Sequence, residues 1–249
     1  VLPAMFSDIS YILQAFNSIN DDLQFVMDID CNYHRYPKEH PSFEKTSDQE
    51  LKVLLNNIAQ MDILLGSSLR LLLDYEKRIA QYHPSSSVYM EFQPNLISDF
   101  GIQEISTIKR NDSSKFRIGI IGNLSGYYDI LTIKEVLFTI KKKYEDKVEL
   151  IFFGWNGKLP SGEEALKELD FTTQKSVSFL SYYEKLNDLA FDLVLLPLKN
   201  IPFNTTGKSA IKYLEASSFS IPVIASDVYP YKNVIKDIQG NSQRAKRPR

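Results

Sequence analysis

The sequence predicts an α/β protein with a doubly wound parallel sheet in its second half and a shorter unit of the same kind in its first half. From residue 115 onward, short apolar runs alternate regularly with segments of helical periodicity. Before residue 97 a similar alternation occupies a shorter stretch, and the polar segment 98–114 separates the two. Apolar strands that alternate with helices are typical of parallel sheets covered by helices on both faces.

The first unit is predicted over residues 1–97. We expect helices over 5–18, 47–60 and 69–81, and strands over 23–30, 61–68 and 87–95. The first of these strands ends in carboxylates, at Asp28 and Asp30, and His34 follows. The chain starts at Val1 without a methionine, so either it is a piece of a longer protein or its ends are processed or engineered.

The second unit is predicted over 115–240, followed by a loose basic tail at 241–249. We expect strands over 116–122, 148–154, 176–180, 191–198 and 221–226, and helices over 129–144, 162–170, 182–190 and 207–219, with a short one near the end. Ligands of such sheets bind at the carboxyl ends of the strands. The loops after Gly122, Gly154, Leu180 and Leu198 should therefore form the binding crevice.

Composition excludes several classes of function. The net charge of −2 over 249 residues argues against a general nucleic-acid binder. One cysteine, Cys31, excludes an internal disulfide framework and a thiolate metal site, and three histidines leave little for another metal site. No apolar run approaches the roughly 20 residues of a membrane span, and the default location is a reducing cytosol. Contact of the basic tail with the inner face of a membrane, and self-association, stay open.

The stretch Phe-Asn-Thr-Thr-Gly-Lys-Ser, 203–209, resembles a phosphate-binding loop, but its spacing does not fit. Such a loop needs a glycine five residues before its second glycine, so that backbone N–H groups can surround a phosphate. Here that position is Pro202, which has a fixed φ and no N–H. We therefore reject a P-loop.

The same stretch predicts the start of a helix over 207–219, with Thr205 and Thr206 as caps. Lys208, Lys212 and Glu215 then lie on one face. A lysine in the first turn opposes the helix dipole, whereas a bound anion would reverse that penalty. A solvated charged face with a Lys212–Glu215 pair is the alternative interpretation.

The run 192–231 carries a resemblance to a known family. It contains Pro197-Leu198, Phe203-Asn204, Lys208-Ser209, Lys212 and Glu215, then IPVIAS and Tyr229-Pro230-Tyr231. In this order it is similar to the donor half of the retaining GT-B glycosyltransferases (glycosyltransferase group 1, family 4-like) of bacteria, which have two Rossmann-like domains. FVMDID, HRYPKEHP and MDILLGSS in the first half resemble the end of that family's acceptor-side domain.

The resemblance implies a nucleotide-diphosphate-sugar donor and no metal or other cofactor. Lys208 would pair with the donor diphosphate and Glu215 would bind the ribose hydroxyls, and these two are the predicted catalytic residues. Tyr182 would cover the base, although an aromatic residue at a helix start is also typical of a core. The other predicted donor-binding residues are Asn123, Gly126, Tyr127, Asn204, Ser209 and Lys212. A plain turn explains Gly126 equally well.

Asp28, Asp30 and His34 would position the acceptor or the transferred sugar, with capping and turn roles as the alternative. The resemblance implies a hexosyltransferase of surface polysaccharide or glycoconjugate synthesis, with a sugar, lipid-linked or protein acceptor. In the common form of the family a glutamate stands eight residues before the second one, and here that position is Gly207. A non-catalytic binding or partner subunit of the same fold therefore stays open, as does a sugar-nucleotide epimerase.

Overall fold

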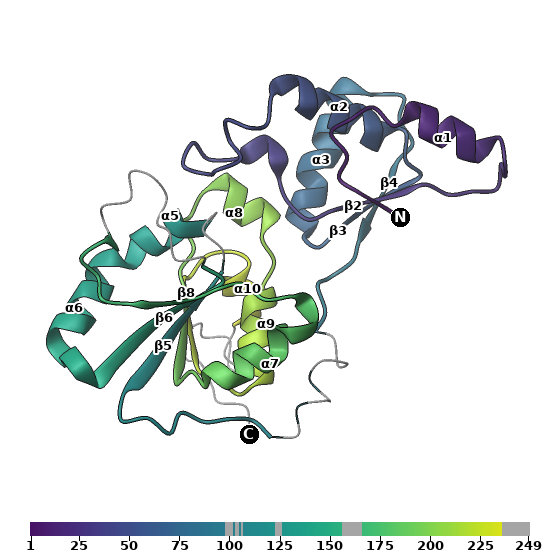
Figure 1. The fold of residues 1–249 in the computed structure, drawn as a ribbon. Helices are drawn as coiled ribbons and strands as arrows, with labels where there is room; N and C mark the ends of the chain where they lie inside the picture. Colours follow the sequence, from purple (N-terminus) through teal and green to yellow (C-terminus); the bar gives the residue numbers. More distant parts are fainter. Residues whose placement is uncertain (98–101, 103–104, 106, 123–125, 156–165, 236–249) are drawn as a thin grey trace. The chain divides into compact units, whose positions relative to one another are not determined.

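The computed structural model describes residues 1–97, 102, 105, 107–122, 126–155 and 166–235 (Figure 1). The chain divides into two compact units. Unit 1 comprises residues 1–95 and 200–209, and unit 2 comprises 96–199 and 210–249. Residues 200–209, which we expected in the second domain, thus belong to unit 1. Three predicted segments lie wholly or partly outside the described residues. They are the linker 98–114, of which 98–101, 103–104 and 106 are not described, the helix 162–170, of which 162–165 are not described, and the whole tail 241–249.

Unit 1 contains a four-stranded sheet in which all neighbouring strands are parallel. Its order follows the sequence: β1 (Leu2–Pro3), β2 (Val26–Ile29), β3 (Ile63–Gly66) and β4 (Tyr89–Phe92). The strands β2, β3 and β4 lie within the predicted runs. The two-residue β1 is too short to produce a periodic signal in the sequence.

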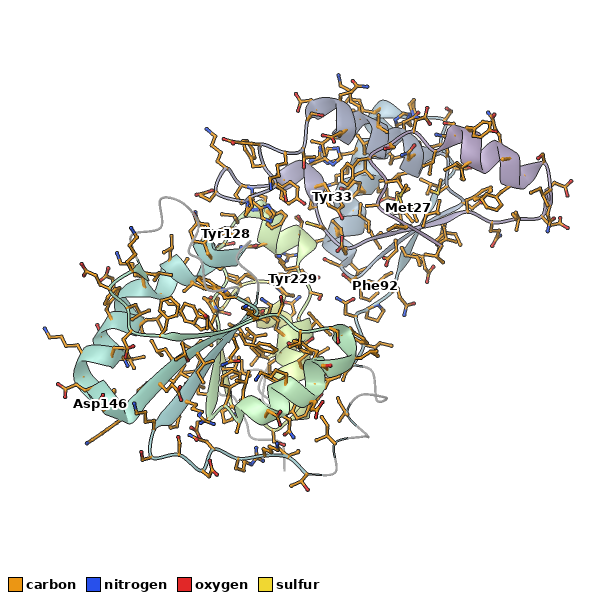
Figure 2. All side chains as sticks on the ribbon, viewed as in Figure 1. Met27, Tyr33, Phe92, Tyr128, Asp146 and Tyr229 are labelled. Carbon is orange, nitrogen blue, oxygen red and sulfur yellow. The ribbon has the colours of Figure 1, made fainter. Side chains whose placement is uncertain are left out.

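The helices of unit 1 are α1 (Ser10–Asn17), α2 (Asp48–Ala59), α3 (Leu69–Tyr82) and α8 (Pro202–Gly207), with a 3-10 turn η1 (Tyr33–Arg35). Ser47 and Glu50 form a capping box that fixes the start of α2. The core between the helices and the sheet includes Met27, which is fully buried (Figure 2), and Leu64. Apolar residues at helical spacing on α2 and α3 therefore bury the covered face of this sheet.

Unit 2 contains a five-stranded parallel sheet of order β7-β6-β5-β8-β9. Its strands are β5 (Phe116–Ile121), β6 (Val148–Phe153), β7 (Thr172–Gln174), β8 (Leu193–Leu196) and β9 (Val223–Ala225). The chain builds outward from β5 through β6 to β7, then returns to place β8 on the other side of β5. The strand order therefore reverses between β5 and β8, which is where ligands of open α/β sheets bind.

Helices lie on both faces of this second sheet, as predicted (Figure 1). They are α5 (Tyr127–Ile130), α6 (Lys134–Tyr144), α7 (Phe179–Leu189), α9 (Ile211–Ser218) and α10 (Tyr231–Val234), with 3-10 turns η3 (Leu131–Ile133) and η4 (Glu145–Lys147). In Figure 1, α6 lies on one face, and α7 and α9 lie on the other. Buried residues of α7, α9, β8 and β9 share one core cluster, which includes Leu186, Val194 and Ala216.

Two predicted elements are wrong. The strand expected at 176–180 lies instead at Thr172–Gln174, and Phe179 and Leu180 begin α7 with exposed side chains. The alternation of Val177 and Phe179 resembled a buried strand face, yet both side chains are exposed. The helix expected over 207–219 is two helices, α8 and α9, because Lys208 has extended backbone angles (φ −89°, ψ 146°).

Candidate functional site

The end of β5 in unit 2 is shaped by a glycine and a lysine. Gly122 follows β5 with φ +151°, a backbone conformation that favours glycine. A Cβ at position 122 would lie only 2.5 Å from Nζ of Lys212, so the lysine ammonium occupies the space that a side chain there would fill. Lys212 is the second residue of α9, which follows β8. The loop after β5 and the helix after β8, the two strands between which the strand order reverses, are therefore in contact at Lys212.

Glu215 lies one turn further along α9 and is held by Tyr182 of α7. The Tyr182 hydroxyl donates a hydrogen bond of 2.8 Å to Oε2 of Glu215. Tyr182 also stacks on Phe153, the last residue of β6, with ring centroids 5.4 Å apart and an interplanar angle of 15°. Burial raises the pKa of Glu215, while the Tyr182 hydroxyl and the Lys212 charge act in the opposite direction. Burial also raises the pKa of Tyr182, and the neighbouring Glu215 adds to this effect.

Two further polar residues of this region were not among the predicted site residues. Asp129 of α5 is buried and accepts a 2.8 Å hydrogen bond from the backbone N–H of Lys199, which follows β8. Tyr231 of α10 is buried, and its pKa is raised by burial and then by the charges of Asp129 and Glu215. In the sequence, Asp129 is an acidic residue within an otherwise apolar helical run, and this is the feature that could have indicated a functional role.

Lys208 is not in the first turn of a helix, so the electrostatic argument that we made for it from the sequence is wrong. It follows α8 and belongs to unit 1. Its Nζ lies 5.0 Å from the ring centroid of Phe203, which is buried against the rings of Tyr36 and His40. The argument about an anion at a helix start applies instead to Lys212, in the first turn of α9.

The short helix α8 is anchored on unit 1 by hydrogen bonds and by close packing. Asn32 Nδ2 donates to the hydroxyl of Thr206 (2.9 Å), and the Ser68 hydroxyl donates to the Thr206 carbonyl (2.8 Å). A Cβ at Gly207 would lie 2.9 Å from the backbone nitrogen of Asn32. Thr205 and Thr206 therefore lie inside this helix rather than at a cap, and their hydroxyls bond the carbonyls four residues earlier.

The structure places the remaining predicted residues in different environments. Asn204 is fully buried in α8, and the Ser209 hydroxyl accepts a 2.6 Å hydrogen bond from Nδ2 of Asn95, within unit 1. In unit 2, Gly126 caps the N-terminus of α5 and Tyr127 is its buried first residue. Asn123 lies outside the described residues.

The predicted acceptor-side residues do not form one cluster of contacts. Asp28 and Asp30 are both exposed, and Oδ1 of Asp30 accepts a 2.7 Å hydrogen bond from the Tyr33 hydroxyl. His34 is half-buried, with its Nδ1 3.4 Å from the Tyr75 hydroxyl. Burial, followed by the charge of Arg78, lowers the pKa of His34 to about 4. This imidazole is therefore neutral near pH 7.

The described residues contain neither a metal-ligand cluster nor a membrane-spanning helix. Among these residues, no group of three His, Cys, Asp or Glu side chains is arranged to hold a metal ion. None of the described helices is long and apolar enough to cross a membrane.

The strand ends of unit 2 therefore combine two chemical capacities. A carboxylate offers about four acceptor positions, and Tyr182 uses one of those of Glu215, so the carboxylate can also accept from neighbouring hydroxyls of a ligand. Lys212 beside Gly122 offers a cation where backbone can approach closely. A ligand with a diol and an anionic group separated by a short spacer matches both.

Comparison with solved structures finds proteins of similar fold. No protein-family profile matches the sequence, and no curated protein matches it significantly. Similar solved structures include S. aureus TarM, solved as a G117R mutant in complex with fondaparinux, α-GlcNAc-glycerol and UDP (TM-score 0.57, 17% identity), which matches 91% of this chain. OtsA in its apo form (TM-score 0.56, 10% identity) matches 88% of this chain.

A third similar structure is the E. coli trehalose-6-phosphate protein bound with UDP-2-fluoro glucose, at a TM-score of 0.57 and 10% identity over 88% of this chain. The matched parts span 41%, 56% and 57% of the lengths of these three proteins, so this chain corresponds to about half of each. At such identities the likeness concerns the fold. The chain has the α/β fold of the GT-B glycosyltransferases, with two Rossmann-like units built on parallel sheets of four and five strands.

Proposed function

We propose that this protein transfers a hexosyl group from a nucleotide-diphosphate sugar to an acceptor, with retention of the anomeric configuration. In this reaction the bond between the sugar C1 and the diphosphate breaks, a bond from C1 to an acceptor oxygen forms, and a nucleoside diphosphate leaves. Negative charge grows on the leaving diphosphate, so a fixed cation beside it stabilises the transition state.

The observation that carries the proposal is the pairing of Lys212 and Glu215 on one helix at the strand-order reversal of unit 2. Lys212, whose ammonium lies in the space beside Gly122, would bind the diphosphate. Glu215, oriented by Tyr182, would bind the ribose hydroxyls. The fold likeness to glycosyltransferases, two of which were solved with UDP or a UDP-sugar analogue, supports a nucleotide-sugar donor.

The roles of the other residues rest on the sequence resemblance. We propose Lys208 as a second partner of the diphosphate, and Asp28, Asp30 and His34 as groups that position the acceptor. The same resemblance is the basis for four further proposals. These are retention, a bacterial setting, a cytoplasmic location at the inner face of the membrane, and a place in surface polysaccharide or glycoconjugate synthesis. Lysine and helix N–H groups would replace a metal at the diphosphate.

Calorimetric titration with UDP, GDP and the corresponding nucleosides tests the site. Lys212→Ala should weaken binding of the diphosphates by about ten- to a hundred-fold and leave the nucleosides unchanged, because a charge-assisted contact contributes about 1.5–3 kcal/mol. Glu215→Gln should weaken nucleosides and diphosphates alike. Lys208→Ala should also weaken binding of the diphosphates and leave the nucleosides unchanged, because Lys208 is proposed as a second partner of the diphosphate.

Lys142→Ala is the matched control, since Lys142 is exposed in the last turn of α6, shortly before the start of β6, whereas Lys212 lies beside the residue that follows the end of β5. It should bind all four ligands as the parent does. If Lys212→Ala and Lys142→Ala give equal affinities for UDP and GDP, the proposed diphosphate site is wrong.

A second candidate function is a binding or partner subunit of the same fold without turnover. The observation in its favour is Gly207, at the position where the resembling family has a glutamate: a Cβ there would meet the backbone of Asn32. Incubation with UDP- and GDP-sugars distinguishes the two candidates. Release of nucleoside diphosphate that Lys212→Ala reduces favours the enzyme, whereas tight UDP binding without any release favours the subunit.

A further inference from the structure

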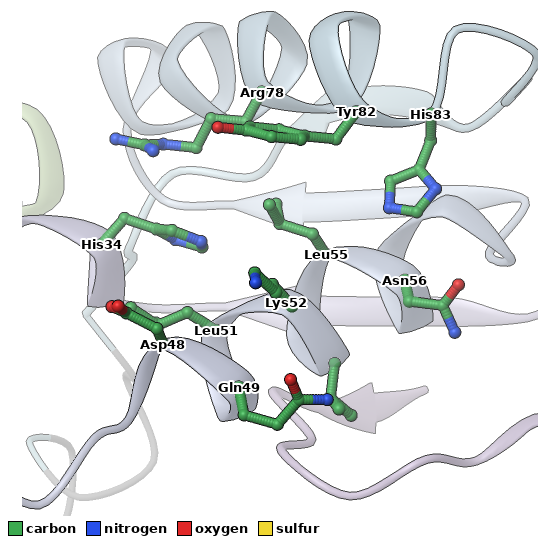
Figure 3. A pocket seen from close by; sticks show the side chains of 11 residues that line it. His34, Asp48, Gln49, Leu51, Lys52, Leu55, Asn56, Arg78, Tyr82 and His83 are labelled. Atoms are coloured by element: carbon green, nitrogen blue, oxygen red, sulfur yellow. The ribbon is translucent and has the colours of Figure 1, made fainter.

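Unit 1 contains a cavity of about 600 Å³ between α2 and α3, lined by residues of unit 1 (Figure 3). One wall is formed by α2, with Leu51, Lys52 and Leu55. The other wall is the end of α3, with Arg78 and Tyr82, and His34 lies between the two walls. Such a volume lies within the range of small-molecule sites.

The cavity carries more positive than negative charge. The Lys52 ammonium makes no ion pair or hydrogen bond with any residue that the structure describes. Within the described part of the chain, the Arg78 guanidinium pairs with Asp74 alone, through Nε to Oδ2 at 3.0 Å, and Asp74 also pairs with Arg35. One carboxylate thus faces two guanidinium groups. Asp48 at the rim is the acidic group of the lining.

The inner surface of the cavity is apolar. Leu55 is buried, Leu51 is half-buried, and the Tyr82 ring lies along the α3 wall (Figure 3). The His34 ring adds no charge because it is neutral near pH 7. Its Nε2 is buried and makes no hydrogen bond in the described part of the chain. A ligand with an apolar or ring-shaped body therefore fits against these walls, with its charge toward Lys52 and Arg78.

We propose that this cavity binds a small phosphate monoester, whose phosphate lies between Lys52 and Arg78 and whose organic body packs on Leu51, Leu55 and Tyr82. A phosphate monoester matches two cations on facing helices better than a carboxylate does, because it carries nearly two negative charges on three oxygens. The terminal nitrogens of a guanidinium suit two of those oxygens, and an ammonium suits the third. This site depends on unit 1 alone and not on the proposed glycosyl transfer.

Calorimetric titration of the full chain with phenyl phosphate, inorganic phosphate and benzoate tests the proposal. Phenyl phosphate should bind most tightly, because inorganic phosphate lacks the apolar body and benzoate lacks the second charge. Lys52→Gln should weaken phenyl phosphate by about tenfold. Asp48→Asn should strengthen it by about two- to three-fold, since it removes a like charge from the rim.

Lys77→Gln is the matched control, because Lys77 is exposed on the same α3 helix and does not line the cavity. Equal affinities of Lys52→Gln and Lys77→Gln for phenyl phosphate would overturn the proposal, as would benzoate binding at least as tightly as phenyl phosphate. The titrations are repeated with saturating UDP and with Lys212→Ala. If saturating UDP or the Lys212→Ala substitution abolishes phenyl phosphate binding, the ligand occupies unit 2 and the cavity proposal is wrong. If the protein does not bind UDP but still binds phenyl phosphate, the proposed glycosyl transfer fails and the cavity proposal holds.

Discussion

Substitution of Gly207 by alanine should destabilise unit 1, although alanine is the better helix former. Gly207 ends α8, and its φ is not in the left-handed region. In a helix without close neighbours, glycine to alanine gains about 0.5–1 kcal/mol. Here the added Cβ would lie 2.9 Å from the backbone nitrogen of Asn32 and 3.3 Å from its Cβ.

The atom in conflict is backbone, so the contact cannot be relieved by a side-chain rotation, and α8 or Asn32 must move. Overpacking of this kind costs about 1–3 kcal/mol. A shift of α8 would also lengthen the two hydrogen bonds at Thr206, at 2.9 and 2.8 Å. After the gain in helix propensity is subtracted, the free energy of unfolding should fall by roughly 0.5–2 kcal/mol.

Urea denaturation followed by tyrosine fluorescence and by circular dichroism measures this change. Gly126→Ala is the control, because its Cβ would meet only Oδ2 of Asp129, at 3.6 Å, which is an ordinary contact. Its free energy of unfolding should change by no more than about 0.5 kcal/mol. A Gly207→Ala protein as stable as the parent, or more stable, would refute the close packing of α8 on Asn32.

Three further predictions concern hydrogen bonds and titration. Tyr182→Phe removes the hydrogen-bond donor of the half-buried Glu215 carboxylate, so the free energy of unfolding should fall by about 1–2 kcal/mol in urea titrations; an unchanged value would contradict the bond. Burial, followed by nearby positive charges, lowers the pKa values of His34 and His40 to about 4. As the pH decreases from 6.5 to 4, these histidines take up protons in the unfolded chain before they do so in the folded one, so the free energy of unfolding should fall. His40→Gln should make this dependence on pH less steep. Burial would raise the pKa of Asp74, but hydrogen bonds from Arg35, Asn32 and Arg78 lower it to about 2, so a further loss of about 2 kcal/mol should follow between pH 3.8 and 2; a flat profile there would contradict this pairing.

The alternating pattern of apolar runs was enough to predict the fold class, because buried parallel strands such as Leu193–Leu196 are apolar throughout. It failed where the strand was an edge and mostly polar, as in Thr172–Gln174, which has only β6 as a neighbour. It also failed where exposed apolar residues imitated a buried face, as at Phe179. The spacing of apolar residues indicates which side chains are buried. It therefore misleads where a strand has few buried side chains or where exposed side chains are apolar.

The candidate site was predictable only in part. Helical spacing put Lys212 and Glu215 on one face, their assignment to a donor site came from the family resemblance, and in the structure both lie on α9, which follows β8. The break at Lys208 was not visible in the sequence, because the residues between α8 and α9 are compatible with a continuous helix. The end of α8 packs against Asn32, 175 residues earlier in the chain (207 − 32). Contacts between residues so distant in sequence leave no periodic signal.

The membership of residues 200–209 in unit 1 has a consequence for how the protein is made. On the ribosome, residues 1–95 emerge long before α8, so the surface formed by Tyr36, His40 and Asn32 must wait for Phe203 and Thr206, which arrive only after most of the second sheet has been synthesised. The first unit in the sequence is therefore completed late, and the aromatic surface that receives Phe203 stays uncovered during that interval. A nascent chain paused before residue 200 should expose this surface to chaperones, and one released after residue 209 should not.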